Sequence, residues 1–309
     1  MEIAQRILDG DVRALARGIS DVEDGAPGSA EILRELFPHT GTATVMGITG
    51  SPGAGKSSLV DRLVAAYRTS GKRVGVVAVD PSSAYSGGAI LGDRVRMQGH
   101  ATDPGVFIRS MASRGHMGGL SRAASDAVDL MDAAGYDPVI VETVGVGQDE
   151  IDIARAADVV AVVLVPGMGD DILAIKAGIL EIADIFVINK ADRAGADRVA
   201  ADLEAMMALA PQPGAPKPPI FRTIALSGEG IPELATGLLG LVASDPAAHR
   251  AARRRERAEM RFLGVLTDRF LAGIRGEGRR YQEIVGEIAD RRLDPYTAAE
   301  RLLREGKAS

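Results

Sequence analysis

Short apolar runs alternate with longer amphipathic stretches through the middle of the chain. Runs rich in β-branched residues predict strands at 44–49, 73–80, 106–110, 137–143, 158–165, 184–190 and 219–226. The segments between them are long enough for helices, for example Ser57–Thr69 and Leu120–Ala134. Strands that are buried on both faces have continuous apolar runs of this kind. The pattern therefore predicts an α/β fold with a mostly parallel sheet that helices cover on both faces.

The two ends of the chain have helical patterns without strand-like runs. Residues 1–40 carry apolar positions at helical spacing, and a glycine-rich stretch at 18–29 interrupts them. The proline-rich segment Pro211–Pro219 predicts a surface connection before the last strand. We therefore expect an N-terminal helical extension at 1–40, a central domain at 41–243 and a C-terminal helical region at 244–309.

Composition excludes several classes of protein. With 309 residues, 46% of them hydrophobic and 25% charged, the chain is typical of a folded soluble protein. The absence of cysteine excludes disulfides, thiolate metal sites and a cysteine nucleophile, and four dispersed histidines do not favour a transition-metal site. A net charge of -6 gives no general attraction to nucleic acid or anionic membranes. The longest apolar run, near 159–165, is too short to cross a bilayer. We expect a cytoplasmic protein with no nucleic-acid or membrane partner.

The clearest motif is Gly-Ser-Pro-Gly-Ala-Gly-Lys-Ser at 50–57, between an apolar run and an amphipathic stretch. In G-x-x-x-x-G-K-S, the glycines let successive backbone N–H groups and a helix N-terminus face phosphate oxygens. Lys56 would reach the β and γ phosphates, and the Ser57 hydroxyl would ligate Mg²⁺. The motif predicts a nucleoside triphosphate site. Its expected nucleotide-binding residues are Gly50, Ser51, Pro52, Gly53, Ala54, Gly55, Lys56, Ser57 and Ser58.

A second motif, Asn189-Lys190-Ala191-Asp192, ends a later strand, where its loop would lie at the carboxyl edge of the sheet. A carboxylate at Asp192 can accept from N1–H and the 2-amino group of guanine, whereas adenine lacks this pair of donors. Asn189 would bond O6 or tie loops together, and the Lys190 stem would lie over the base. Backbone N–H groups of Ser227 and Gly228 are further candidates for the base edge. The motif favours guanine.

Three acids are candidates for the metal. Asp80 and Glu142 end predicted strands, and Asp93 lies in a glycine-rich segment. Mg²⁺ takes oxygen ligands and usually keeps waters, so one or two of these acids with Ser57 and phosphate would suffice.

The glycines after Glu142 predict a segment that switches conformation with the bound nucleotide. The Gly145 N–H is a candidate for the γ-phosphate, so that the segment would order with triphosphate and relax after hydrolysis. Gln148 is either a water-orienting glutamine or a residue at a helix start. The expected catalytic set is thus Lys56, Glu142, Gly145 and Gln148.

Taken together, GITGSPGAGKS, AVDPSS with SGGAILGDRVRM, VIVETVGVGQ, PGMGDDILAIKAGILEIAD and NKAD resemble the MeaB/ArgK family of P-loop GTPases. That family comprises the G-protein chaperones of adenosylcobalamin-dependent methylmalonyl-CoA mutase. The resemblance implies that Lys56, Ser57, Asp80, Asp93 and Glu142 form the phosphate and magnesium site, and that Asn189, Lys190 and Asp192 bind guanine. It also implies that a block containing Asp170, Asp171 and Lys176 couples the nucleotide state to the mutase.

Because the sequence offers no clear catalytic base, we expect GTP hydrolysis that is slow in the isolated chain and faster with a partner. The resemblance implies that the chain gates cofactor loading or protects the mutase. Its ligands would be Mg²⁺ and GTP or GDP, with no cobalamin on this chain. Two alternatives remain. A metal-insertion GTPase usually carries Cys or His clusters, which this chain lacks. An ATP-dependent kinase or ATPase linked to lysine, arginine and ornithine transport conflicts with the guanine motif.

The C-terminal region suggests how the chain associates. An arginine cluster at 250–257 is interleaved with acids and has few aromatic neighbours, which favours a solvated helix face over a nucleic-acid site. Apolar positions with helical spacing follow and would bury against the domain or a second subunit; they are Met260, Phe262, Leu263, Leu266, Phe270 and Leu271. Because the family tends to dimerise through such helices, we expect a homodimer.

Overall fold

The computed structural model describes residues 2–80, 98–100, 102–112, 122–143, 156–167, 182–209, 217–276 and 278–306. The chain forms two compact units, Met1–Arg253 and Arg254–Ser309. The first unit holds the sheet.

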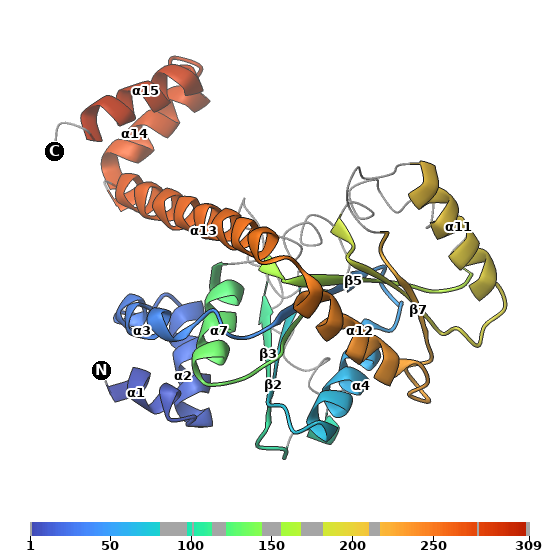
Figure 1. The fold of residues 1–309 in the computed structure, drawn as a ribbon. Coiled ribbons are helices and arrows are strands. Elements are labelled where there is room, and N and C mark those ends of the chain that lie inside the picture. The colour runs from blue at the N-terminus through green and yellow to red at the C-terminus, as the bar shows by residue number, and fades with distance from the viewer. Residues whose placement is uncertain are drawn as a thin grey trace. The chain divides into compact units, whose positions relative to one another are not determined.

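The strands of the first unit form one parallel sheet, which confirms the predicted α/β fold (Figure 1). Every predicted run contains a strand; the strands are β1 (Val45–Gly50), β2 (Val74–Asp80), β3 (Val106–Ala112), β4 (Val139–Thr143), β5 (Val159–Leu164), β6 (Ile185–Asn189) and β7 (Ile220–Thr223). Their order is β3-β2-β4-β1-β5-β6-β7, with parallel pairing between neighbours. The carboxyl ends of β1, β2, β4 and β6 therefore meet at one edge, where ligands bind in sheets of this kind.

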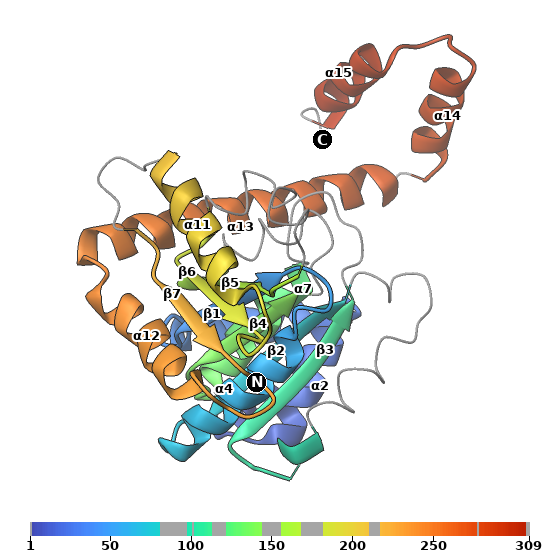
Figure 2. The same cartoon turned by 90° about the vertical axis from the view of Figure 1, so that its right-hand side faces the viewer.

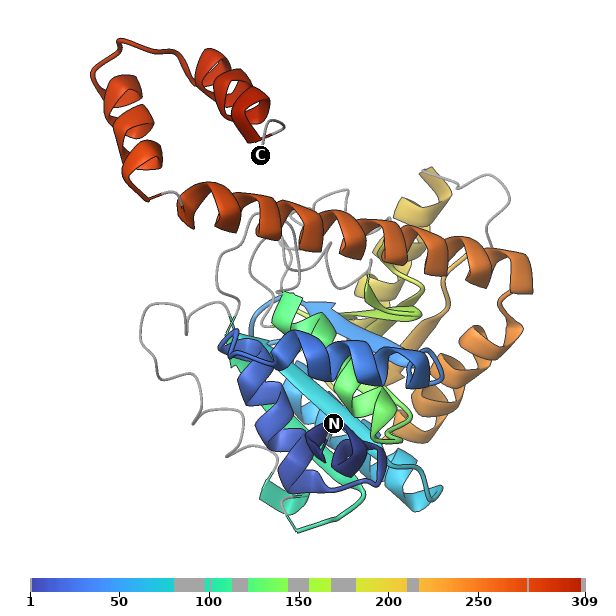
Figure 3. The ribbon, with the colours of Figure 1, turned by 90° about the vertical axis from the view of Figure 1, so that its left-hand side faces the viewer.

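Helices cover both faces of the sheet. On one face α4 (Lys56–Thr69) and α12 (Ile231–Ser244) lie side by side (Figure 2). The other face carries α7 (Arg122–Ala133) and α11 (Ala196–Leu209). Three N-terminal helices pack over α7 (Figure 3); they are α1 (Glu2–Leu8), α2 (Val12–Glu23) and α3 (Ser29–Leu36). Short 3₁₀ turns lie at Phe37–His39 and Gln98–His100.

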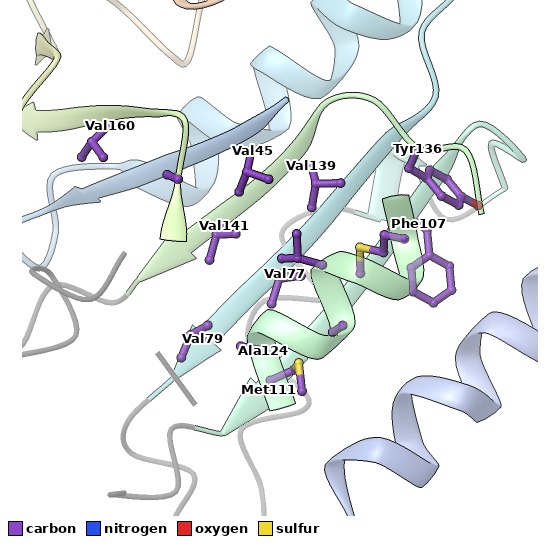
Figure 4. Packing of buried hydrophobic residues seen from close by; sticks show 14 of the residues in the cluster. Val45, Val77, Val79, Phe107, Met111, Ala124, Tyr136, Val139, Val141 and Val160 are labelled. Atoms are coloured by element: carbon purple, nitrogen blue, oxygen red, sulfur yellow. The ribbon is translucent and has the colours of Figure 1, made fainter. Parts of the chain in front are cut away.

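Valines of the central strands make the core on the α7 side. Figure 4 shows Val77, Val139 and Val141 gathered between the sheet and α7, and all three are fully buried. The rings of Phe107 and Tyr136 close this layer, with 6.0 Å between their centroids. Side chains packed at this density hold the strand ends in fixed positions.

The expected break in the N-terminal helices lies later than the glycine pattern suggested, because α2 continues through Gly18 to Glu23. A Cβ at Gly18 would lie 3.0 Å from both Ile7 Cδ1 and Leu130 Cδ2. Gly18 therefore serves close packing of α2 against its neighbours, which outweighs the low helix propensity of glycine.

The C-terminal region is helical, as predicted. It contains α13 (Ala247–Gly276), which begins in the first unit, followed by α14 (Gly278–Ala289) and α15 (Pro295–Gly306). Ile284 of α14 and Ala298 of α15 are buried, and the ion pair of Arg301 with Glu287, at 3.8 Å, joins these two helices. Of the helices in the described part of the chain, none has the length and apolar content needed to cross a membrane.

Candidate nucleotide-binding site

The glycine loop leaves the central strand β1 and enters α4 through backbone conformations that favour glycine. Gly50 has φ +135°, and a Cβ there would lie 2.1 Å from the Val163 carbonyl oxygen. Gly55 has φ +85° and directly precedes α4, and its Cβ would lie 2.6 Å from Asn189 Nδ2. The loop is thus pressed against β5 on one side and against the end of β6 on the other, and side chains at these two positions would collide.

A cavity of about 360 Å³ lies at this loop, within the size range of small-molecule sites. Its lining includes six of the nine residues expected from the glycine-loop motif, together with Glu142; the six are Pro52, Gly53, Gly55, Lys56, Ser57 and Ser58. Ala78, Val79 and Thr143 also line it, and motif reasoning did not identify them. They stand at or next to the ends of β2 and β4, so the strand-end rule could have found them.

Lys56 is almost fully buried, with 5% of its surface exposed. Its Nζ donates to the carbonyl oxygens of Gly50, at 2.6 Å, and Ser51, at 3.0 Å. The ammonium group therefore lies inside the loop, beside the position that phosphate oxygens would take.

Ser57 and Glu142 are in direct contact across the pocket. The Ser57 hydroxyl donates to Glu142 Oε1 at 2.6 Å, which joins the first turn of α4 to the end of β4. A hydroxyl and a carboxylate at this spacing are hard oxygen donors of the kind that Mg²⁺ prefers, so the donor set fits the ion.

The structure does not describe the side chains of the other residues expected at the phosphate side. Asp80 is the last residue of β2, at the correct edge of the sheet, but its side chain is not described. The remaining candidates lie outside the described residues; they are Asp93, Gly145, Gln148, Asp170, Asp171 and Lys176.

Asn189 ties three parts of the site together. Its side chain is buried, with 1% exposed, and Nδ2 donates to the Ala54 carbonyl oxygen at 2.8 Å. Oδ1 accepts from Thr223 Oγ1 at 3.2 Å and from the Ala225 N–H at 3.1 Å. Of its two expected roles, these contacts correspond to the tie between loops.

The rest of the second motif lies at the surface beside the glycine loop. Lys190 adopts φ 56°, and its Nζ donates to the Gly53 carbonyl oxygen at 2.8 Å. Asp192 follows in the same loop and is exposed. One turn therefore holds both Lys190, which bonds the glycine loop, and the exposed carboxylate of Asp192. The glycine loop and this carboxylate lie at the same edge of the sheet.

Residues 224–230, here called the base loop, follow β7 as a compact turn. The N–H groups of Ser227 and Gly228 both donate to the Ile224 carbonyl oxygen, at 3.1 and 2.8 Å. Arg62 of α4 holds the loop from outside by donating to the carbonyl oxygens of Ala225 and Leu226. Sequence reasoning missed Arg62, since no local spacing links residues 163 positions apart.

A phosphate-type loop between a central parallel strand and a helix, tied to a guanine-type motif two strands away, defines a P-loop nucleotide-binding protein. The chain belongs to the MeaB family, described as methylmalonyl Co-A mutase-associated GTPases, whose model matches residues 15–278. The resemblance seen in the sequence is thereby confirmed.

Individual relatives agree with this assignment. A Pyrococcus abyssi protein with a provisional GTPase name is 45% identical over 313 residues, covering 98% of this chain and 96% of that protein. The GTPase ArgK of Escherichia coli is 43% identical over 195 residues, 62% of this chain and 59% of ArgK. The crystal structure of a LAO/AO transport system kinase superimposes with a TM-score of 0.71 at 27% identity, covering 99% of this chain and 97% of that one.

Proposed function

We propose that this chain is a magnesium-dependent GTPase that serves as a chaperone of an adenosylcobalamin-dependent acyl-CoA mutase, with methylmalonyl-CoA mutase as the first candidate. The observation that carries the nucleotide chemistry is the joining of the two motifs. Asn189 and Lys190 each donate to a carbonyl of the glycine loop, so a guanine-binding turn and a phosphate-binding loop form one site. The family description supports the partner.

In this proposal the residues on the phosphate side have separate tasks. The Lys56 ammonium exchanges the Gly50 and Ser51 carbonyls for phosphate oxygens and neutralises charge on them. Ser57 and Glu142, with Asp80 or Asp93, hold Mg²⁺. When bound, the ion neutralises charge on the β and γ phosphates. Asp192 accepts from the guanine base, and the N–H groups of Ser227 and Gly228 exchange the Ile224 carbonyl oxygen for the edge of the base.

The turnover steps of the proposal involve segments outside the described residues. Gly145 contacts the γ-phosphate, Gln148 orients water, and the block with Asp170, Asp171 and Lys176 relays the nucleotide state to the mutase. Hydrolysis is slow in the isolated chain because the partner completes the switch. GTP gates cofactor loading or protection of the mutase, and the chain itself carries no cobalamin.

A homodimer through α13 completes the proposal. Its support is a row of apolar side chains in the second unit that are half exposed or more, namely Phe262 (65%), Leu263 (51%) and Leu266 (52%). Apolar positions at helical spacing are typical of helix pairs. Light scattering that reports a monomer at all concentrations would exclude this part.

Hydrolysis of GTP and ATP, each with and without purified methylmalonyl-CoA mutase, tests the function. We expect slow GTP hydrolysis that rises about tenfold or more with the mutase, and no comparable ATP hydrolysis. The Lys56→Ala variant is the inactive control for contaminating phosphatases. ATP turnover equal to GTP turnover would favour the transport-linked kinase, whereas a GTPase rate that no mutase changes would remove the chaperone role alone.

A further inference from the structure

Arg62 makes a two-pronged contact with the base loop from the helix that carries the phosphate-binding residues. Nε donates to the Ala225 carbonyl oxygen at 3.0 Å, and Nη2 donates to the Leu226 carbonyl oxygen at 2.7 Å. Among the described residues, no carboxylate lies within ion-pair distance of this guanidinium. Its donors are therefore directed to two successive backbone carbonyls, an arrangement that the planar fork of arginine suits and that a lysine ammonium cannot reproduce.

The contact completes a closed chain of hydrogen bonds that runs through Ala225, Asn189 and the glycine loop back to α4. The Ala225 N–H donates to Asn189 Oδ1, and its carbonyl accepts from Arg62. Asn189 in turn donates to Ala54 of the glycine loop, which runs directly into α4 and so back to Arg62. Both backbone polar groups of Ala225 are thus bonded to side chains that belong to, or contact, the phosphate-binding part of the site.

Bonds to both backbone polar groups of Ala225 also restrict the residues next to it. The Leu226 side chain is 83% exposed and gives the loop little packing of its own. Gly230 ends the loop, and its backbone packs so close to Arg222 that a Cβ at Gly230 would lie 2.0 Å from the Arg222 carbonyl oxygen. Between these points the fork of Arg62 bonds the Ala225 and Leu226 carbonyl oxygens and so ties this part of the loop directly to α4.

We propose that Arg62 is a positioning residue for base recognition, which holds the base loop where the N–H groups of Ser227 and Gly228 can exchange the Ile224 carbonyl oxygen for guanine O6. The inference rests on the proposed guanine site and adds to it the residue that sets part of its selectivity. Arg62 itself touches neither base nor phosphate in this scheme. Its removal should therefore weaken recognition at position 6 of the base and leave recognition at position 2, by Asp192, unchanged.

Titration calorimetry of the full chain with three nucleotides tests this separation. GDP presents both recognition edges, 6-thio-GDP replaces O6 with a weaker acceptor, and IDP lacks the 2-amino group. In the wild type GDP should bind more tightly than either analogue. In Arg62→Gln we expect the GDP to 6-thio-GDP affinity ratio to fall about five- to tenfold, because hydrogen bonds to O6 are lost, while the GDP to IDP ratio stays within about twofold.

Two further variants separate positioning from charge and from folding. Arg62→Lys keeps the positive charge but not the fork, so its GDP to 6-thio-GDP ratio should also fall. Arg222→Gln is the matched control, because Arg222 leads into the same loop but bonds the surface residue Asp197; all its ratios should equal those of the wild type. Thermal unfolding with and without GDP shows that each variant is folded.

The outcomes distinguish the inference from the function on which it rests. A wild type that prefers GDP to ADP, with an unchanged GDP to 6-thio-GDP ratio in both Arg62 variants, overturns the role of Arg62 alone. A parallel fall of both ratios in Arg62→Gln also overturns it, since that indicates general damage to the site. Equal binding of GDP and ADP by the wild type overturns the guanine site and this inference together.

Discussion

Asn189 and Ala54 lie 135 positions apart in the chain, yet Asn189 Nδ2 donates a hydrogen bond of 2.8 Å to the Ala54 carbonyl oxygen. The bond joins the last residue of β6 to the loop between β1 and α4, across the intervening strand β5. Because both partners are buried, the bond is shielded from water and breaking it would leave a buried polar atom unsatisfied. The two motifs therefore depend on each other for their positions.

Replacing Asn189 should affect folding and binding together. Asn189→Ala removes three hydrogen bonds and takes away the partner of the buried Ala54 carbonyl and of the buried Ala225 N–H. We therefore expect a loss of about 2–4 kcal/mol in the free energy of unfolding. GDP affinity should fall tenfold or more. Thr223→Val, which removes one of the three bonds and keeps the shape, should cost about 1 kcal/mol. Urea unfolding and calorimetry measure both effects, and equal losses in the two variants would contradict this account.

The two sides of the glycine loop should differ in their tolerance of a methyl group. Gly50→Ala places a Cβ 2.1 Å from the Val163 carbonyl oxygen, so β1 and β5 would have to separate. We expect a loss of about 3 kcal/mol or more in unfolding free energy. Gly53→Ala also has positive φ, +77°, but meets nothing within 4 Å and should cost only about 1 kcal/mol of backbone strain. Similar losses by chemical denaturation would show that steric contact with β5 is unimportant.

Ser57 should carry much of the response to magnesium. If its hydroxyl exchanges Glu142 for the ion, Ser57→Ala loses one ligand, and the tightening of GTP binding by Mg²⁺ should fall about tenfold. Ser58→Ala is the matched control, because Ser58 lines the same pocket and should keep the full magnesium effect. Affinities for GTP in excess Mg²⁺ and in EDTA provide the measurement. The expected role of Ser57 is wrong if both variants respond to Mg²⁺ like the wild type.

Local patterns predicted the sheet and the phosphate loop because their signals lie within short segments. The valine-rich run at 159–165 specifies a buried strand by itself, and residues 50–57 contain every feature of the loop. The sequence wrongly predicted a break in α2 at Gly18. Glycine is needed there because Ile7 and Leu130 pack closely against it, and that contact forms only in the folded structure. Arg62 carries no local signal either, because its partners come together only when α4 and the base loop fold onto the same edge.

The carboxylate of Asp137, before β4 at the edge of the sheet opposite the nucleotide site, should make the stability of the fold depend on pH even without nucleotide. Burial would raise the pKa of Asp137, but hydrogen bonds from the Thr44 N–H (2.9 Å) and from Lys72 Nζ (3.0 Å) outweigh it, and the pKa lies below its ordinary value of 3.8. A depressed pKa in the folded state adds stability above the pKa of the unfolded chain, and this stability is lost as the pH falls through the folded value.

Asp137→Asn should therefore be less stable than the wild type by about 1 kcal/mol at pH 7, a modest value because the ion pair with Lys72 is partly exposed. The difference should stay constant down to about pH 5 and shrink below about pH 4 as the wild-type carboxylate takes up its proton. Asp197→Asn is the control, since Asp197 pairs with Arg222 while 90% exposed, and it should differ little from the wild type at any pH. Urea unfolding at pH 7, 5, 4 and 3 gives the profile, and a difference between Asp137→Asn and the wild type that grows towards low pH would show that the Thr44 and Lys72 contacts do not stabilise the carboxylate.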